Sequence, residues 1–545
     1  MTRVSAASAS ADLTAEVLVV GGGLAGLSAA IEARRAGRDV LLLCKGKAGR
    51  SGNSLVAAGN LSGVHPGIGD DEEAFVRDTL AGGRGIGSPA LVRALAKGSR
   101  EVVPFLEACG VVFARPGGDL ACGRIPGHSR RRTVSAGQAQ RPVASAGLAL
   151  TLPLLREAKR LGTRILEGAA AVEVERRDGR ASGVVALTPE GLLRVGAGSI
   201  VLACGGGTRV YARTNNAPDA TGDGLLLAWE VGAELRDLEF VQFYPTMGLS
   251  PLRAVFSTTL FGEGAVLRTR QGERFLLGTV PGGEVAATRD EMSRAILAEV
   301  SRGGGVGGGV LLDLSGVSPE AGAEWGGGLW RALARRGWDV RKDPVIVGPC
   351  AHFLMGGVTL DDRGATTVPG LFAAGELTGG VHGANRLGGN ALTEAVVFGR
   401  IAGRAAAADV GRVASSSCCA ARALPTGEGD VVLREVRREV RALTWEHAGL
   451  VRSAEGLREG LERWRAVNDR WSALDRGGVT RAAFEVRCLL TVSRLILGSA
   501  LARTESRGAH WRSDAPAADD AQWRGSLRVL PRDGGEPELR YVPAD

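Results

Sequence analysis

The sequence predicts an α/β fold, α+β over the whole chain. It comprises a Rossmann-like domain in two segments, an inserted α+β capping domain and a helical C-terminal domain. Three observations predict this fold. Residues 16–44 run as apolar strand, glycine turn, helix and apolar strand. Residues 346–408 return to the strand–glycine–helix pattern after residues 241–345, in which strands and helices are mixed. Residues 431–503 place apolar side chains at helical spacing among charged ones.

Composition is typical of a large folded protein. The 545 residues predict two to four domains. Hydrophobic residues at 44% and charged residues at 23% exclude general disorder. The 82 glycines follow no three-residue period, which excludes a collagen-like fibre. Aromatic residues make up only 4%, so we expect Ala, Val and Leu to form the core.

The net charge of +8 and the pI of about 9.3 raise the question of a nucleic-acid partner. The basic residues are mostly Arg, are scattered along the chain and have acidic residues among them. This distribution predicts no nucleic-acid binding. A pocket for an anionic substrate would need only a few of these arginines.

None of the eight cysteines forms a C-x-x-C pair, so we expect no bound metal or iron–sulfur cluster. Scattered thiols indicate a reducing compartment. Residues 1–13 lack the hydrophobic core of a signal peptide, and no apolar run is long enough to cross a bilayer. We therefore expect a cytoplasmic protein without direct membrane insertion, peripheral to the inner membrane only through a partner.

The expected domains follow from these textures. Residues 14–240 form the first part of the nucleotide-binding domain, 241–345 the capping domain and 346–410 the second part. An Ala/Ser-rich linker (411–428) precedes the helical C-terminal domain with its irregular tail (429–545).

Within these domains we expect helices in 72–110 and 144–161. Alternating apolar residues predict an antiparallel ribbon from Ala170–Glu175, Gly183–Leu187 and Leu192–Val195. Further strands are expected at Ser199–Ala203 and, in the tail, at Ser526–Leu530.

Gly21, Gly23 and Gly26 have the spacing of a dinucleotide-binding turn. The first glycine permits the tight turn, the second admits a pyrophosphate and the third lets helix and strand pack closely. The helix N-terminus then presents free N–H groups to the phosphates. In a glycine-rich chain such spacing also arises by coincidence. Cys44 stands where an acidic residue usually ends the second strand, with Lys45 next.

Nine further motifs follow in order along the chain: Arg50–Gly59, Thr221–Gly224, Phe240–Thr246, Gly262–Gly264, Arg289–Arg294, His352–Gly357, Gly370–Glu376, His382–Arg386 and Glu505–His510. From about residue 14 to its end, the chain resembles the FAD-dependent family of succinate dehydrogenase and fumarate reductase flavoprotein subunits and L-aspartate oxidase.

The resemblance implies FAD as the cofactor. Gly21, Gly23 and Gly26, with Leu24 and Ala25 between them, would hold the pyrophosphate. The flavin side would be wrapped by Lys45, Ser51, Gly52, Asn53, Ser54, Ala57, Ala58 and Gly59. Asp223 would contact the cofactor from a loop, Glu376 would bind ribose, and Ala391 and Leu392 would lie along the flavin ring. The alternative for Glu376 is a surface acid after a strand.

Asn53 matches the position at which the membrane-bound complexes use a His to hold FAD covalently. An amide cannot form that bond, so we expect non-covalent FAD.

The resemblance also implies a carboxylate-binding pocket. Arg294, His352 and Arg386 match its catalytic positions, with Arg294 moving the proton and the other two binding a carboxylate. Each has a structural alternative. Arg294 lies four residues after Asp290, the spacing of a surface ion pair on a helix. His352 could be a core histidine, and Arg386 a structural cation.

Several positions depart from the family pattern. Tyr244 stands for a His, Thr258 for a Glu, Phe261 for an Arg and Ile125 for a Glu that meets the substrate amine in aspartate oxidase. Thr258 and Phe261 cannot relay protons as the family residues do. The run Arg130–Arg132 would approach an anionic substrate or lie in a solvated loop.

We therefore predict an FAD-dependent oxidoreductase of the succinate dehydrogenase/fumarate reductase type acting on a small carboxylate. L-Aspartate oxidase is the second hypothesis. The third is an electron-transfer subunit whose substrate pocket has decayed. Any iron–sulfur or other electron-transfer centre must lie on a separate protein.

Overall fold

The computed structural model describes residues 13–136, 143–413, 429–473, 480–532 and 536–544. Most of the expected linker, residues 414–428, lies outside the described residues. Among the helices that are described, none is both long and apolar enough to cross a membrane.

A seven-stranded sheet forms the centre of the nucleotide-binding domain, with strand order β5-β2-β1-β8-β7-β6 and β15 paired to β8. The strands are β1 (Leu13–Val20), β2 (Val40–Cys44), β5 (Arg164–Glu167), β6 (Ala170–Arg177), β7 (Arg180–Thr188), β8 (Gly191–Leu202) and β15 (Leu371–Ala373). The predicted antiparallel ribbon is confirmed as β6, β7 and the first half of β8. The second half of β8 runs parallel to β1 and β15. This sheet therefore joins both segments of the domain.

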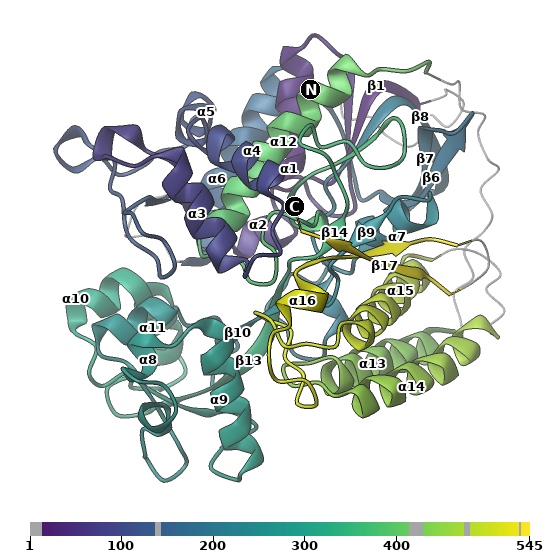
Figure 1. Cartoon of the computed structure of the whole chain (residues 1–545). Coiled ribbons are helices and arrows are strands. Elements are labelled where there is room, and N and C mark those ends of the chain that lie inside the picture. Colours follow the sequence, from purple (N-terminus) through teal and green to yellow (C-terminus); the bar gives the residue numbers. More distant parts are fainter. Residues whose placement is uncertain (1–12, 137–142, 414–428, 474–479, 533–535, 545) are drawn as a thin grey trace.

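Helices α1 (Leu24–Arg35) and α12 (Asn390–Ala408) pack together in front of the sheet (Figure 1). Their close approach depends on two glycines of α12. A Cβ at Gly399 would lie 2.4 Å from the carbonyl oxygen of Ala25, and one at Gly403 would lie 2.3 Å from that of Ala29. The helix that follows the glycine turn is thus fixed by the second segment of the domain.

The helices expected in 72–110 and 144–161 are confirmed: α3 (Glu72–Gly82), α4 (Pro89–Ser99), α5 (Val102–Ala108) and α6 (Val143–Arg160). The carboxylate of Asp71 begins α3 by accepting a hydrogen bond from the N–H of Ala74 at 2.7 Å. The strands β3 (Asn60–Ser62) and β4 (Thr133–Ser135) pair antiparallel in a separate small ribbon.

The capping domain forms a separate lobe with its own hydrophobic core (Figure 1). Its antiparallel sheet has the order β10-β13-β12-β11. The elements are β10 (Val241–Ser250), η4 (Thr258–Glu263), β11 (Val266–Arg268), α8 (Gly283–Ala286), α9 (Arg289–Ser301), β12 (Val310–Asp313), α10 (Pro319–Ala321), α11 (Gly327–Ala334) and β13 (Val345–Leu354). The expected boundary at 345 falls on the first residue of β13, so this strand continues from the cap into the nucleotide-binding domain.

The C-terminal domain consists of α13 (Gly429–His447), α14 (Ala454–Ser472) and α15 (Arg481–Ala502), followed by the short α16 (Asp520–Trp523). The predicted tail strand is confirmed as β16 (Gly525–Leu530). The tail is more regular than expected, because β17 (Glu538–Pro543) pairs with β16. Both join β9 (Leu235–Arg236) and β14 (Gly357–Val358) in one sheet, a long-range pairing that local sequence patterns do not reveal.

Candidate active site and cofactor cavity

A cavity of about 1120 Å³ extends from the glycine turn to the capping domain. It brings together residues that lie as far apart in the sequence as Gly21 and Leu392. The predicted residues that line it are Gly21, Gly23, Leu24, Ala25, Lys45, Ser51, Gly52, Asn53, Ser54, Ala57, Ala58, Asp223, Tyr244, His352, Glu376, Arg386, Ala391 and Leu392. Gly26, Gly59 and Arg294 are not among the lining residues.

The glycine turn has no room for side chains. A Cβ at Gly21 would lie 2.2 Å from the carbonyl oxygen of Ala203, and one at Gly26 would lie 1.8 Å from that of Gly21. Gly23 precedes α1 without a side-chain cap, so the first N–H groups of the helix face the cavity. The N–H of Leu24 donates to Oγ of Ser54 at 3.0 Å. These features fit a pyrophosphate at the turn, with Gly26 serving helix packing.

Lys45 and Asp223 meet beside the turn. Nζ of Lys45 lies 2.6 Å from Oδ2 of Asp223 and 3.4 Å from Oε1 of Glu485. Burial lowers the pKa of Lys45, but the two carboxylates outweigh it and raise that pKa above its usual value. Lys45 is therefore a fixed cation at the cofactor end of the cavity.

Asn53 and Glu376 form the next contact along the cavity. Nδ2 of Asn53 donates to Oε2 of Glu376 at 2.9 Å and to Oδ1 of Asn216 at 2.7 Å. Burial raises the pKa of the Glu376 carboxyl to about 7. A Cβ at Gly206 would lie 2.2 Å from Oε1 of Glu376, so the carboxylate is seated directly against the backbone. The alternative of a surface acid does not fit this position in the cavity wall.

The N-terminus of α12 also faces the cavity, through Ala391 and Leu392. Gly389 precedes this helix without a side-chain cap, and its backbone has φ of 79°. A Cβ there would lie 2.0 Å from Oγ of Ser62. The open helix end adds positive potential, which favours an electron-rich group in the cavity. Together with the turn, Lys45 and Glu376, this arrangement fits an extended dinucleotide such as FAD.

Arg386 also lines the cavity and is buried. Its Nη2 donates to Oε1 of Gln242 at 2.8 Å, and its guanidinium lies over the ring of Phe353, 4.5 Å from the centroid. Its Nε is buried without a hydrogen-bond partner. Burial, together with the positive charge of Arg289, lowers the pKa of Arg386 to about 9. A buried cation with an unused donor has the properties of an anion-binding group.

Tyr244 lies between two other cavity residues. Its ring centroid is 5.2 Å from that of His352 and 5.0 Å from the guanidinium carbon of Arg289. Burial, Arg386 and Arg289 lower the pKa of His352 well below its usual value, so this imidazole is neutral at neutral pH. Nδ1 of His352 lies 3.0 Å from the side-chain nitrogen of Asn215, which orients the ring.

Arg294 does not join this cluster. Its Nη1 lies 3.2 Å from Oδ2 of Asp290, and its guanidinium lies over the ring of Trp511 at 4.7 Å. The structure thus matches the ion-pair alternative that the sequence offered. Arg289 begins the same helix, α9, and lines the cavity. Five residues correspond to about 140° around a helix, so only one of the two arginines can face the cavity.

Sequence reasoning missed Arg289, although both arginines stand in one motif. The available signal was the helix start. Thr288 caps α9 and forms a capping box with Glu291, which makes Arg289 the first helical residue. That position places it at the end of the helix that meets the cavity.

The departures from the family pattern lie on the cavity wall. The hydroxyl of Tyr244 accepts a hydrogen bond from the N–H of Thr258 at 3.0 Å. Phe261 is buried in the core of the cap and also reaches the cavity. Ile125 approaches Gly388, where an added Cβ would meet its Cγ2 at 2.6 Å. Arg130 and Arg131 are exposed, whereas Arg132 is buried against Asp70 at 2.7 Å and serves the fold.

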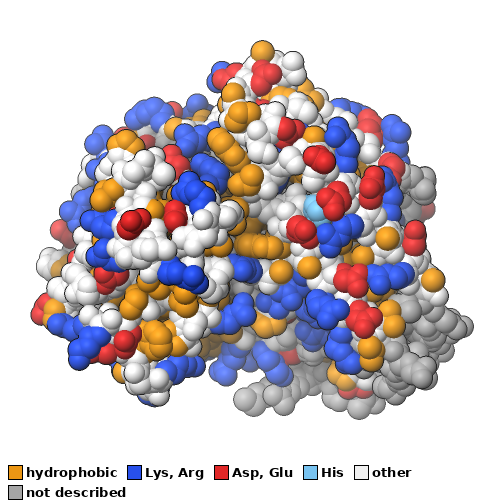
Figure 2. Space-filling model, turned by 90° about the horizontal axis from the view of Figure 1, so that it is seen from below, with side chains coloured by type: hydrophobic (Ala, Val, Ile, Leu, Met, Phe, Trp, Pro, Cys, Tyr) orange, Lys and Arg blue, Asp and Glu red, His pale blue; other side chains and the backbone are white. Residues whose placement is uncertain are grey.

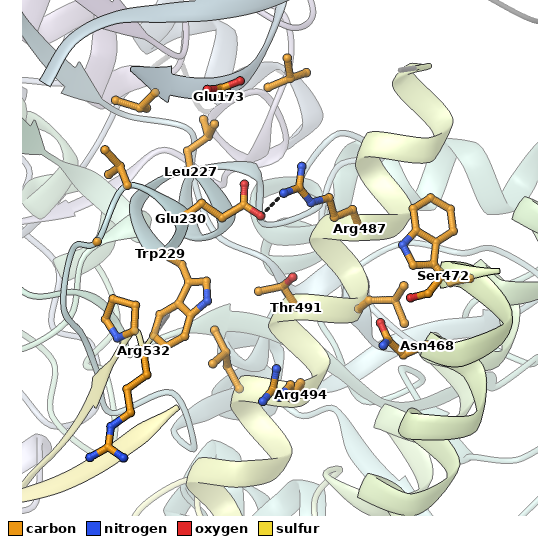
Figure 3. A pocket seen from close by; sticks show the side chains of 18 of the residues that line it. Glu173, Leu227, Trp229, Glu230, Asn468, Ser472, Arg487, Thr491, Arg494 and Arg532 are labelled. Atoms are coloured by element: carbon orange, nitrogen blue, oxygen red, sulfur yellow. Dashed lines mark hydrogen bonds and ion pairs between the residues drawn. The ribbon is translucent and has the colours of Figure 1, made fainter. Parts of the chain in front are cut away.

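A second cavity, of about 910 Å³, lies between β6, the end of α7 (Asp223–Glu230) and helices α14 and α15 (Figure 3). Arg487 is bound to Glu230 across it (Figure 3). Two more of its arginines, Arg494 and Arg532, pair with Glu536 and Glu538. None of the predicted site residues lines this cavity. The pair of Arg487 and Glu230 joins the C-terminal domain to α7, whereas the other two pairs lie within the C-terminal domain. The first cavity, which the predicted residues line, is therefore the candidate active site.

Two family models match the chain. The family model of the FAD binding domain matches residues 16–392. The family model of the fumarate reductase flavoprotein C-terminal region matches residues 437–545. The chain belongs to the FAD-dependent oxidoreductase family of fumarate reductase and succinate dehydrogenase flavoproteins and L-aspartate oxidases. Its cofactor is FAD.

Relatives in this flavoprotein family match almost end to end. The CoM/CoB fumarate reductase of Methanothermobacter marburgensis contains a chain that is 35% identical over 537 residues, covering 94% of this chain and 96% of that one. L-Aspartate oxidase of Mycobacterium tuberculosis is 34% identical over 522 residues, 94% of each chain.

Solved structures of the flavoprotein family show the same fold. The flavoprotein chain of E. coli quinol fumarate reductase superposes with a TM-score of 0.86 at 27% identity, covering 98% of this chain and 97% of that one. Mycobacterium smegmatis Sdh1 gives a TM-score of 0.81 at 30% identity, covering 97% and 94%. The predicted fold class, with its helical C-terminal domain, is confirmed.

Proposed function

We propose that this flavoprotein oxidises or reduces the carbon skeleton of a small carboxylate, with Arg289 as the residue that moves the proton. The observation that supports this most strongly is the cationic end of the cavity. Arg386 has an unpartnered buried Nε, and Arg289 lies close enough to help lower its pKa. A bound carboxylate would satisfy both the donor and the excess charge.

Each polar side chain of the substrate region would have a separate role. Arg386 would hold the carboxylate, and neutral His352 would donate a hydrogen bond without adding charge. Arg289, at the start of α9 on the cap, would deliver or remove the proton. Closure of the cap would exclude water from the reacting carbons. FAD, when bound, supplies or accepts the hydride.

The FAD would be bound non-covalently. Both polar atoms of the Asn53 amide already have hydrogen-bond partners. Nδ2 donates to Glu376 and Asn216, and Oδ1 accepts from the N–H of Ala217 at 3.0 Å. An amide nitrogen in this role positions the cavity wall rather than forming a bond to the cofactor.

L-Aspartate oxidase is the second candidate, and the 34% identity to that enzyme favours it. The amine of aspartate needs an acceptor, however, and Ile125 supplies none. We therefore rank the carboxylate reductase or dehydrogenase above it. The electron-transfer hypothesis with a decayed pocket is the weakest, since a decayed site has no reason to keep a buried Arg386 whose Nε has no hydrogen-bond partner.

A separate electron carrier would dock on a basic surface. Arg209, Arg213, Arg253, Arg437 and Arg441 form a cluster in which each lies close enough to influence at least one other. Burial, with the charges of Arg209, Arg437 and Arg253, lowers the pKa of Arg441 to about 10. Arg253 also lines the cavity. Figure 2 shows Lys and Arg side chains gathered in the middle of the face seen from below. An acidic electron-transfer protein would complement this arginine cluster.

Anaerobic titration of the purified holoprotein tests the proposal. Succinate, L-aspartate and related acids are added while the visible absorbance of the flavin is followed, and reduced protein is mixed with unsaturated acids. Bleaching or reoxidation by one of them supports the proposal. A full flavin spectrum that none of them changes would contradict it, and reduction by L-aspartate alone would favour the second candidate.

A further inference from the structure

The two ends of the substrate region differ in charge. Arg386, Arg289 and His352 form one end. Tyr244 stands at the boundary, because its ring contacts Arg289 and His352 while its hydroxyl binds the N–H of Thr258. The cap also contributes six lining side chains without charge: Met247, Val255, Ser257, Thr258, Phe261 and Met292. We call these six residues the uncharged wall.

The uncharged wall is built into the fold. Met247 and Val255 pack with Tyr244 and Cys350 in one small apolar cluster. Phe261 and Met292 are 5% and 1% exposed and belong to the core of the cap. Their positions are therefore held by packing, and a second carboxylate placed against them would lose its hydration without gaining a partner.

Other charges on the cavity do not change this conclusion. The nearest acid of the cap that lines the cavity, Glu284, is already used: its oxygens accept from the N–H of Leu267 at 2.9 Å and from Arg274 at 2.8 Å. The remaining lining arginines, Arg84, Arg124 and Arg253, are exposed to water. Their charge is screened by solvent, unlike that of Arg386.

We propose that the substrate is a monocarboxylate, a 2-alkenoate or the corresponding alkanoate, whose uncharged remote end lies against the uncharged wall. This inference rests on the proposed function and narrows its substrate class from carboxylates in general to those with one negative charge. The single carboxylate would bind Arg386, and the chain would extend past Tyr244 toward Thr258 and Phe261.

The reaction balances with the groups already named. In the reducing direction the π bond between C2 and C3 breaks. C3 receives a hydride supplied by reduced FAD, and C2 receives a proton from Arg289, which recovers a proton from solvent. The 2-alkenoate becomes an alkanoate and FAD returns to its oxidised form. Negative charge that develops toward the carboxylate is stabilised by Arg386.

Crotonate and fumarate provide a matched test, because they differ only by a methyl group in place of a carboxylate. Each is added anaerobically to dithionite-reduced holoprotein, and reoxidation of the flavin is followed. Perturbation of the oxidised flavin spectrum measures binding separately. We expect crotonate to exceed fumarate at least about 100-fold in the second-order rate constant, since an unpaired buried charge is strongly rejected.

A preference for fumarate would overturn the monocarboxylate inference while leaving the proposed function standing. If neither acid reoxidises the flavin or perturbs its spectrum, both fail. The two failures are therefore distinguishable in one experiment.

A charge placed in the uncharged wall provides the second test. Thr258→Lys introduces a cation at a partly exposed position, so the core of the cap stays intact. We expect it to shift the crotonate-to-fumarate ratio at least about 10-fold toward fumarate, because the added cation would pair with the second carboxylate. The matched control is Ser315→Lys, at an exposed cap position outside the cavity. An unchanged ratio in Thr258→Lys, with the flavin spectrum intact, would contradict the proposed orientation.

Discussion

The guanidinium of Arg289 lies over the ring of Tyr244, with its central carbon 5.0 Å from the ring centroid. This contact joins the first residue of the cap helix α9 to strand β10, and it holds the cation beside His352 and Arg386. The family His at position 244 would place a titratable group here, whereas Tyr offers a neutral aromatic face. The contact thus sets the position of the proposed proton donor.

The first prediction compares the two arginines of α9. Arg289→Gln should lower the rate of flavin reoxidation by carboxylate about 10²- to 10⁴-fold, because the general acid is lost. Arg294→Gln should change it less than about threefold, since Arg294 faces Asp290 and Trp511. Anaerobic stopped-flow measurements on FAD-saturated protein check both. Equal losses in the two variants would refute the assignment.

The second prediction concerns the glycine turn. Gly26→Ala should yield protein largely free of FAD, because its Cβ would collide with the carbonyl oxygen of Gly21 at 1.8 Å. Gly262→Ala is the matched control, since nothing lies within 4 Å of its added Cβ. The ratio of flavin absorbance to protein absorbance after purification measures the difference. Full FAD content in Gly26→Ala would show that the turn can shift without cost.

The third prediction concerns the attachment of FAD. Acid precipitation of the holoprotein should release all of its FAD into the supernatant, because the Asn53 amide forms only hydrogen bonds. Absorbance of the supernatant and of the redissolved pellet measures the two fractions. Yellow colour that remains with the denatured pellet would reveal a covalent bond.

The fourth prediction concerns pH. Burial raises the pKa of Glu376 to about 7, so the folded protein without FAD binds this proton more tightly than the unfolded chain does. The free energy of unfolding should therefore fall as pH rises from about 4.5 to 7. Above pH 7, Glu376 should no longer change it. Thermal unfolding of the apoprotein measures it, with Glu376→Gln as the variant in which this component is absent. Parallel pH profiles in the two proteins would count against a buried carboxyl.

The fifth prediction concerns the arginine cluster. Arg253→Gln combined with Arg437→Gln should slow reduction of the flavin by an acidic [2Fe–2S] ferredoxin several-fold and weaken its salt dependence. Reduction by dithionite should change little. Arg335→Gln with Arg336→Gln, at exposed positions on the cap, is the control for lost charge alone. If the control pair slows ferredoxin equally, the docking surface lies elsewhere.

Local patterns were sufficient for much of the cofactor half of the site. The strand–turn–helix unit, the uncapped start of α1 and the antiparallel ribbon all rest on interactions between near neighbours in the chain. The spacing of glycines and apolar residues therefore predicts these elements. The positions of Lys45 and Glu376 on the cavity follow from the strand ends at which they stand.

Only the tertiary structure decided which arginine faces the cavity. Arg289 and Arg294 share a motif, and the rotation of α9 against β10 alone separates the cavity side from the side that meets Trp511. The same holds for the uncharged wall, whose members come from β10, η4, α9 and the segment between β10 and η4. The sequence by itself determined the family, through its resemblance in an ordered set of motifs. It also determined the dinucleotide turn, because such a turn depends on local backbone geometry. The charge pattern of the substrate region depends on side chains that are far apart in the sequence. Only the folded structure therefore reveals it.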